Sequence, residues 1–352
     1  MASRYKKQVS LGYNQDGKRV RKWIRAETQQ ELKRKERELL KNAEQALVAP
    51  KRFGEYAQAW LKTYKSNKET RTREFYESGV KKLSALNGRE LSRITRSQLQ
   101  EVLAENWEHP RTCKKLANIM SQIFRSAIAD GLIWKNPAES LDIPKQIKTE
   151  KRILSDAEKK AIDTVELPPS EKVFLHIIRQ LGLRPEEARA LTRTDIDFKN
   201  KTISINKAVI FAKNAPELKG VKNDKPRVLP LPNGLKTELR SYIKDVQWLL
   251  FTDSKGNLMS KSSFRCFQRR IFDEVNRKLG GNDKMNVLNG MTFYTLRHTR
   301  GTELYYLAQK GKISTKLAAQ YMGHGEIVFL STYSHIDEQK EDLKALKAVT
   351  NL

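Results

Sequence analysis

Residues 293–306 read FYTLRHTRGTELYY, and residues 321–335 read YMGHGEIVFLSTYSH. The first stretch sets Arg297 among polar neighbours, and the second places Tyr333 nine residues after His324. A guanidinium keeps its charge at any working pH and can hold two phosphate oxygens at once, while a phenol hydroxyl can form a covalent phosphate ester. The two stretches therefore carry residue types suited to binding and bonding a phosphate group, against the alternative of core histidines and a buried tyrosine.

Two earlier segments carry further candidate residues. Residues 182–198, GLRPEEARALTRTDIDF, place Arg184 and Glu187 at the start of a helix, with Pro185 where its missing N–H costs nothing. Residues 218–232, LKGVKNDKPRVLPLP, contain several lysines. Each signal is weak alone, because an arginine at a helix start is usually a salt-bridge partner and a loop lysine is usually a solvated charge.

In their order along the chain, these four segments resemble the conserved boxes of the tyrosine recombinase family, and the resemblance covers the chain from about Phe53 onward. It implies that the tyrosine takes up the 3′ phosphate and that a lysine protonates the departing 5′ oxygen. The phosphotyrosyl ester stores the energy of the backbone bond, so resealing needs neither ATP nor hydrolysis. No metal or other cofactor is implied. The residues implied as catalytic are Arg184, Lys222, Tyr294, Arg297, His324 and Tyr333, with Glu187 in support.

Two of these assignments carry open questions. Lys222 is favoured as the lysine by its distance to the Leu-Pro-Leu strand, while Lys219 and Lys225 remain alternatives. The family usually has a histidine or lysine three residues before the second arginine, where this chain has Tyr294. A phenol with a pKa of about 10 accepts protons poorly at neutral pH, so we expect Tyr294 to position the phosphate by hydrogen bonding. The arginine charges are expected to lower the pKa of Tyr333.

The charge balance identifies the class of partner. Of 352 residues, 68 are Lys or Arg and 41 are Asp or Glu, which leaves a formal net charge of +27. Like charges repel in a compact fold, so this surplus indicates a polyanion. DNA is the first candidate, and a membrane surface is disfavoured because no run of about 18 apolar residues occurs. Cys113 and Cys266 fit unpaired thiols in a reducing compartment, which predicts a cytoplasmic protein acting on DNA in a bacterial host cell.

The N-terminal part predicts a small sheet with one helix. Residues 4–26 alternate apolar and basic side chains around an Asn-Gln-Asp-Gly turn, which is typical of a β-hairpin. Thr28 then opens a helix with Glu31 as its capping-box partner. A two-stranded ribbon of this kind can enter a DNA groove. This part is similar to the arm-binding module of phage and conjugative-element integrases.

The rest of the chain predicts two helix-rich domains. The first is helical from Phe53 to about Leu132, with Tyr64 on a buried face, Ser97 capping the third helix and Ile128 in the apolar stripe of the fourth. The last has two β-like stretches, separated by a Lys/Gly/Asn-rich loop, among helices. The fold class is thus α+β multidomain: a hairpin-plus-helix domain, an all-α core-binding domain, and a mainly α catalytic domain with a small antiparallel sheet. The predicted boundaries are 1–48, 53–144 and 153–352.

Basic side chains concentrate on the hairpin and on the central helices. Those of the hairpin are too many for a domain so small to need for solubility, and those of the helices suit a clamp on phosphates. The predicted DNA-binding residues are Lys6, Lys7, Lys18, Arg19, Arg21, Lys22, Arg25, Lys81, Lys82, Arg111, Lys114 and Lys115.

These observations predict an integrase that inserts and excises a phage or other mobile element. From the family resemblance we expect core and arm-type DNA sites, a homotetramer on DNA, and an excisionase and a DNA-bending protein as accessory partners. Residues 336–352 include DLKALKAVTNL, which predicts a short amphipathic helix that docks on a neighbouring subunit or packs on its own domain. The alternatives are a recombinase that resolves chromosome dimers and a non-catalytic DNA-binding protein derived from a recombinase.

Overall fold

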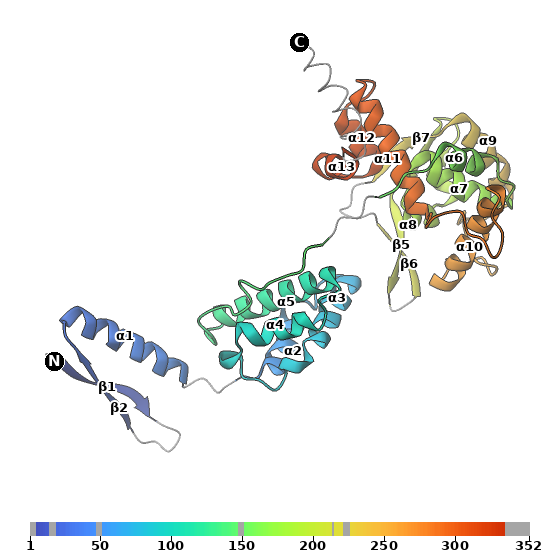
Figure 1. The fold of residues 1–352 in the computed structure, drawn as a ribbon. Helices are drawn as coiled ribbons and strands as arrows, with labels where there is room; N and C mark the ends of the chain where they lie inside the picture. Colours follow the sequence, from blue (N-terminus) through green and yellow to red (C-terminus); the bar gives the residue numbers. More distant parts are fainter. Residues whose placement is uncertain are drawn as a thin grey trace, which may run out of the picture. The chain divides into compact units, whose positions relative to one another are not determined.

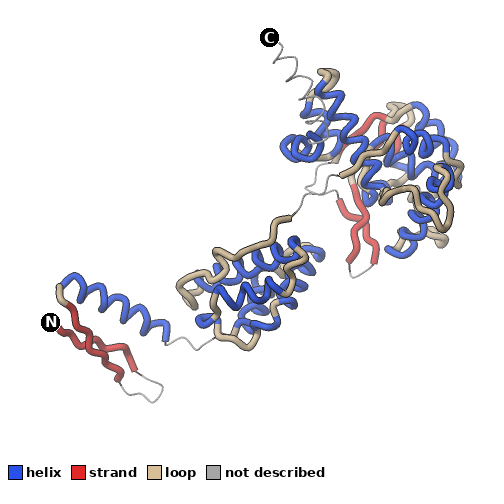
Figure 2. Tube along the Cα trace, in the orientation of Figure 1, coloured by secondary structure: helices blue, strands red, loops and turns tan. Residues whose placement is uncertain are grey.

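The computed structural model describes residues 5–13, 19–46, 51–146, 151–212, 215–220 and 226–334. The chain splits into two compact units, residues 1–148 and 149–352 (Figure 1). Among these residues helices dominate, and the described strands form three small antiparallel sheets (Figure 2). The predicted α+β fold class is confirmed, whereas the division into three domains stays a prediction.

The N-terminal hairpin pairs β1 (Tyr5–Tyr13) with antiparallel β2 (Arg19–Ala26) and packs on helix α1 (Gln29–Ala46). Side chains on a strand alternate between its two faces, so Val9, Ile24 and Ala26 lie on the same face of the hairpin. All three are buried. The predicted cap is present, since Thr28 Oγ1 accepts the Glu31 N–H at 3.2 Å. The predicted turn lies outside the described residues.

The central helices enclose a core of their own. Phe53, Trp60, Leu103 and Phe124 belong to one cluster of buried side chains. The helical elements are α2 (Phe53–Tyr64), α3 (Thr70–Lys82), η1 (Ser84–Leu86), η2 (Leu91–Arg93), α4 (Arg96–Ala104) and α5 (Pro110–Ala129).

Three expectations for these helices were wrong. The cap of α4 is Thr95 rather than Ser97, because Thr95 and Gln98 satisfy each other's backbone N–H groups in a capping box. Tyr64 and Ile128 are exposed rather than buried. Tyr64 is the last residue of α2, and Ile128 lies next to the fully buried Ala127 near the end of α5, outside the set of residues that α5 buries.

The second unit surrounds the central helix α7 with helices and two small sheets. One sheet has the order β3-β4-β7 with Ile203 opposite Leu229, and the other is the hairpin β5-β6. The elements are α6 (Asp156–Thr164), α7 (Pro169–Leu181), α8 (Pro185–Arg189), η3 (Arg193–Asp195), β3 (Ile196–Asp197), β4 (Thr202–Ile205), β5 (Lys207–Ala212), β6 (Ala215–Gly220), β7 (Arg227–Pro230), α9 (Asn233–Tyr242), η5 (Ile243–Asp245), α10 (Lys261–Lys278), α11 (Phe293–Gln309), α12 (Thr315–Met322) and α13 (Glu326–Tyr333).

Strand β6 corrects a sequence-based expectation. Its residues belong to the stretch that was predicted to be a Lys/Gly/Asn-rich loop, but they pair with all of β5 from Lys207↔Gly220 to Ala212↔Ala215. Cross-strand pairing outweighs the poor strand propensity of a segment that contains Pro216 and Gly220.

Two glycines end the helices that border the site. Gly182 follows α7 with φ 65°, and Gly323 follows α12 with φ 64°. This left-handed conformation costs glycine little and closes a helix C-terminus. At each of these two helix ends a backbone carbonyl oxygen, that of Gly182 or that of Met322, lies next to α11.

A second, smaller core lies between α11, α12 and α13. It consists of Leu304, Ala318, Ala319, Met322, Phe329 and Tyr333. None of the described helices is both long enough and apolar enough to cross a membrane. The predicted C-terminal helix within residues 336–352 lies outside the described residues.

We predict that Phe174→Ala will destabilise the second unit strongly. Phe174 on α7 meets Phe251, Phe267 and Phe293 edge to face, with centroids 4.9–5.2 Å apart, so truncation leaves a cavity. We expect a loss of about 3–5 kcal/mol in the free energy of unfolding, measured by hydrogen exchange of residues 173–178 in urea. The exposed Trp248 serves as control, and Trp248→Ala should cost only about 0.5 kcal/mol. Equal losses would contradict a central role for Phe174.

Candidate active site

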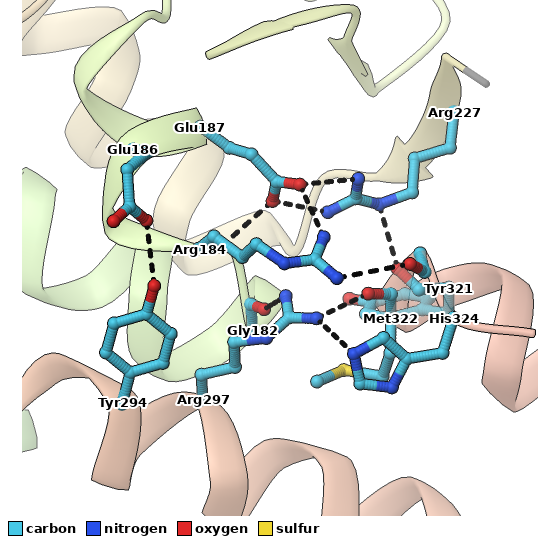
Figure 3. Close-up of polar contacts among 11 residues, drawn as sticks. Gly182, Arg184, Glu186, Glu187, Arg227, Tyr294, Arg297, Tyr321, Met322 and His324 are labelled. Carbon is cyan, nitrogen blue, oxygen red and sulfur yellow. Dashed lines mark hydrogen bonds and ion pairs between the residues drawn. The ribbon is translucent and has the colours of Figure 1, made fainter. Parts of the chain in front are cut away.

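Arg297 lies at the centre of the site, on the first turns of α11, with only 3% of its surface exposed. Its Nη1 donates to the carbonyl oxygen of Gly182, and its Nη2 donates to that of Met322 at 2.6 Å (Figure 3). Nη2 also lies 3.0 Å from Nε2 of His324. Burial, followed by the charge of Arg184, lowers the pKa of Arg297 to about 10, so the guanidinium is still charged at neutral pH.

Arg184 supplies a second, more accessible guanidinium. It is the residue before α8, and its Nη1 donates to Glu187 at 2.8 Å while its Nη2 lies 3.3 Å from the carbonyl oxygen of Gly323. Its side chain is 34% exposed. The site therefore has the partly exposed guanidinium of Arg184 beside the buried one of Arg297 (Figure 3).

Glu187 is a buried carboxylate that holds two arginines. It accepts from the backbone N–H and side chain of Arg184, and it forms a two-pronged pair with Arg227 at 3.1 and 2.7 Å. Burial alone would raise its pKa, but hydrogen bonds and charge from Arg227, with the charges of Arg297 and Arg184, lower it to about 2. Glu187 is therefore ionised throughout the physiological range.

Arg227 is a site residue that the sequence analysis missed. It starts β7, inside the segment in which only lysines were considered, and its Nε donates to the carbonyl oxygen of Tyr321 at 3.1 Å. The sequence feature that could have identified Arg227 was its position directly before the Val-Leu-Pro segment of the predicted strand. That signal is weak, because a basic residue at a strand end is usually solvated.

His324 follows the α12 glycine cap and faces Arg297. Its Nε2 receives the guanidinium N–H, so a neutral ring carries its proton on Nδ1, which is buried without a hydrogen-bond partner among the described residues. Burial, then the charges of Arg297, Arg184 and Arg227, lower its pKa to about 4 against the opposing charge of Glu187. At neutral pH, His324 thus carries a buried Nδ1–H for which no described residue is an acceptor.

Tyr333 ends α13 and is buried, with 2% of its surface exposed. Its ring stacks on His324 at 6.0 Å and lies 5.0 Å from His298 and 4.9 Å from Phe329 between centroids. The expected lowering of its pKa was wrong. Burial raises the pKa and outweighs the charges of Arg297 and Arg184, which act in the opposite direction.

Tyr294 does not point at the arginines in this structure. Its hydroxyl donates to Glu186 at 2.9 Å, and burial, then the Glu186 charge, raise its pKa to about 12 (Figure 3). The proposed hydrogen bond to a phosphate stays a prediction. The structure does not choose among the lysines either: Lys219 lies on β6, while Lys222 and Lys225 lie outside the described residues.

The basic residues of the hairpin divide between its two faces. Lys6 and Arg25 form one cross-strand pair, and Arg21 and Trp23 share their face, where Lys6 Nζ lies 4.4 Å from the Trp23 ring. Lys7 and Lys22 lie on the opposite face, which carries Val9 and Ile24, and Lys7 pairs with Glu36 of α1 at 2.8 Å. Lys18 and the side chain of Arg19 lie outside the described residues.

The basic residues of the central helices lie on α3 and α5. Lys81, Lys82, Arg111 and Lys114 are exposed. Lys115 is half-buried: it donates to Ser78 at 2.6 Å and covers the Phe75 ring. Phosphate binding by these residues remains a prediction.

Comparison with known proteins assigns the chain to a family. The phage integrase family model matches residues 148–340, and the phage integrase central domain matches residues 53–143. The chain belongs to the phage integrase family. A tyrosine recombinase XerC-like protein of Caldanaerobacter subterraneus is 24% identical over 99% of this chain and 96% of its own length.

Two solved structures share the fold. The Tn1549 transposon integrase, in complex with a circular intermediate DNA, has a TM-score of 0.67 and 19% identity over 82% of this chain and 99% of its own. A lambda integrase tetramer bound to a Holliday junction has a TM-score of 0.59 and 18% identity over 80% of this chain and 78% of its own.

We predict that Gly301→Ala will expel Tyr333 from its buried position. A Cβ at Gly301 on α11 would lie 2.2 Å from Cζ and 2.5 Å from the hydroxyl oxygen of Tyr333, closer than real contacts allow. Tetranitromethane should therefore nitrate Tyr333 in this variant and spare it in the unaltered protein, as read by peptide mass spectrometry. Gly234→Ala is the matched control, because nothing lies within 4 Å of its Cβ position. Continued protection of Tyr333 in Gly301→Ala would contradict the observed packing.

Proposed function

We propose that this chain is a site-specific DNA recombinase of the integrase type, which cuts and rejoins strands through a phosphotyrosyl bond to Tyr333. One observation carries the proposal: two guanidiniums and a neutral histidine donor converge beside a tyrosine that stacks on that histidine. Two arginines can neutralise the charge that develops on a phosphoryl group in flight. The tyrosine supplies the nucleophile.

Each step follows from the chemistry of these groups. The phenol oxygen of Tyr333 bonds to phosphorus as the bond from phosphorus to the 5′ oxygen breaks, and a lysine protonates the departing oxygen. Arg184 and Arg297 hold the non-bridging oxygens, and the free Nδ1–H of His324 donates to one of them. The attack of a 5′ hydroxyl on the phosphotyrosine reverses the bonds and reseals a strand. Because burial raises the pKa of Tyr333, its proton passes to a water molecule as the new bond forms rather than before it.

The N-terminal hairpin favours an integrase over a chromosome-dimer resolvase. Its outward face carries Lys6, Arg21 and Arg25 around Trp23, a composition suited to a DNA groove. We propose that this face binds arm-type sites and that the remainder binds core sites, in a tetramer on paired duplexes in the cytoplasm of a bacterial host. An excisionase and a DNA-bending protein fit the same scheme as accessory partners.

We predict that Tyr333→Phe will abolish the covalent adduct while DNA affinity changes less than about twofold, because a single buried hydroxyl is lost. Incubation with nicked suicide DNA and electrophoresis in SDS measures the adduct. A normal yield from the Phe variant would move the nucleophile elsewhere, with Tyr321 next to test. An absence of adduct from the unaltered protein would favour a non-catalytic DNA-binding protein.

We predict that removing the outward charges of the hairpin will weaken binding to distal sites alone. The triple change of Lys6, Arg21 and Arg25 to Ala should reduce the log–log salt slope by about 0.9 for each phosphate that the hairpin no longer neutralises and spare cleavage of a short core site. Lys7 was also predicted to bind DNA, but it pairs with Glu36 on the other face, so Lys7→Ala should change the slope less and serves as the comparison. Deletion of residues 1–50 should have the same effect as the triple change. Loss of core-site cleavage in either folded variant would contradict this division of labour.

We predict that the C-terminal tail docks on the α12–α13 surface of a neighbouring subunit. Ile327 is 84% exposed there, with Val328 and Leu317 also exposed, and the sequence of residues 342–352 is that of a short amphipathic helix that could cover them. Truncation after Asp337 and Ile327→Asp should each weaken tetramer formation on DNA, measured by sedimentation. Met285→Asp, at an exposed position in the same unit, should leave it unchanged. Unchanged sedimentation of the truncated protein would place the tail on its own domain.

A further inference from the structure

Arg227 joins three segments that are far apart in the sequence. Its Nη1 and Nη2 donate to the two carboxylate oxygens of Glu187 on α8, and its Nε donates to the carbonyl oxygen of Tyr321 at the end of α12. Its own backbone starts β7, opposite Ile205 of β4. The side chain is only 10% exposed, so solvent screens these contacts little.

The guanidinium of Arg227 is held by the protein. Each of its three nitrogens donates to a protein oxygen, and the two-pronged pair makes the Glu187 carboxylate its main partner. Its planar, forked geometry matches the carboxylate of Glu187, which a lysine could not reproduce. Arg227 therefore acts on the reaction through the groups that it holds.

Those groups are the ones that carry the proposed chemistry. Glu187 binds Arg184 through the backbone and the side chain, and the carbonyl of Tyr321 lies three residues before His324. The turn between them is fitted to Arg227: a Cβ at Gly323 would lie 2.9 Å from Nη1 of Arg227. One side chain thus fixes the supports of Arg184 and of His324 at once (Figure 3).

We propose that Arg227 is a positioning residue for strand cleavage, which holds Glu187 against Arg184 and ties β7 to the Tyr321–His324 turn. This inference rests on the proposed recombinase function. Small errors in the placement of phosphate-binding groups are costly, since a shift of about 1 Å can reduce a rate on the order of 10²-fold.

The ion pair between Arg227 and Glu187 also keeps the Glu187 carboxylate ionised. Four groups face this carboxylate: Arg184 from the start of α8, Arg227 from β7, Arg297 from α11 and the neutral His324 after α12. Burial opposes ionisation, and Arg227 is the strongest of the groups that restore it. Without Arg227 the pKa of Glu187 rises, so the carboxylate becomes protonated, and Arg184 loses its partner, as pH falls. With Arg227 present the pKa is about 2, and this group does not titrate between pH 5 and 8.

The test compares Arg227→Gln with Arg152→Gln in the full-length chain. Arg152 is a matched control, because it also forms a two-pronged pair with a buried glutamate, Glu158 at 2.9 and 3.0 Å, and also donates to a carbonyl, that of Leu288, and these bonds involve neither Arg184, Glu187 nor His324. Adduct formation on suicide DNA is timed between pH 5 and 8, with DNA affinity measured in parallel.

We expect Arg227→Gln to slow cleavage on the order of 10²-fold, with a further loss toward pH 5 that the unaltered protein lacks, and with DNA affinity within about twofold. The double variant with Glu187→Gln and Arg227→Gln should not show this further loss of cleavage rate toward pH 5, because it lacks the carboxylate that becomes protonated. Arg152→Gln should cleave at nearly the normal rate. Arg227→Lys, which keeps the charge without the fork, should recover part of the rate, and it carries the test if the Gln variant does not fold.

The outcomes separate the two proposals. If the unaltered protein forms no Tyr333-dependent adduct, the recombinase function itself fails. If it does, and Arg227→Gln or Arg227→Lys cleaves at the normal rate with an unchanged pH profile, the positioning role is overturned. An equal slowing by Arg152→Gln would likewise overturn it, since general destabilisation would then explain the loss.

Discussion

The buried charge of Arg297 is the constraint on which the site depends. A cation removed from water needs close acceptors, and the acceptors here are backbone carbonyls rather than a carboxylate: those of Gly182 and Met322. Both carbonyls lie at helix C-termini, the ends that carry partial negative charge. The glycine-capped ends of α7 and α12 must therefore meet the start of α11, and this meeting places Arg184 and His324 beside Arg297.

The resulting site is strongly cationic. Arg184, Arg227 and Arg297 supply three positive charges, and Glu187 supplies one negative charge, so these four groups sum to +2. The field of the three arginines helps to keep His324 neutral. A neutral imidazole with a free N–H adds a donor without adding further repulsion. The arrangement suits a phosphodiester, whose anionic oxygens supply the missing countercharge.

The sequence predicted the parts of the site that depend on residue identity and spacing. Arg184, Arg297, His324 and Tyr333 were named from their motifs, and the structure brings them together. Arg227 was missed because its role depends on β7 passing α8, which spacing does not reveal. The pKa direction of Tyr333 was wrong for a related reason: arginines can be seen in a sequence, whereas the closeness of the Gly301 backbone cannot. Local propensity alone did not reveal the Thr95 cap or strand β6, because each depends on a hydrogen-bond partner elsewhere in the chain.

In the proposed reaction, burial of Tyr333 links cleavage to a rearrangement. A DNA phosphate cannot meet a side chain that is 2% exposed unless α13 or its surroundings shift. The ring completes the small core with Met322 and Phe329, so its withdrawal leaves an unfilled space that costs on the order of 3–5 kcal/mol. Interactions with the phosphate, or between α13 and a neighbouring molecule, have to supply that energy. In the proposed reaction, the interactions that release Tyr333 from this core would therefore also decide when a strand is cut.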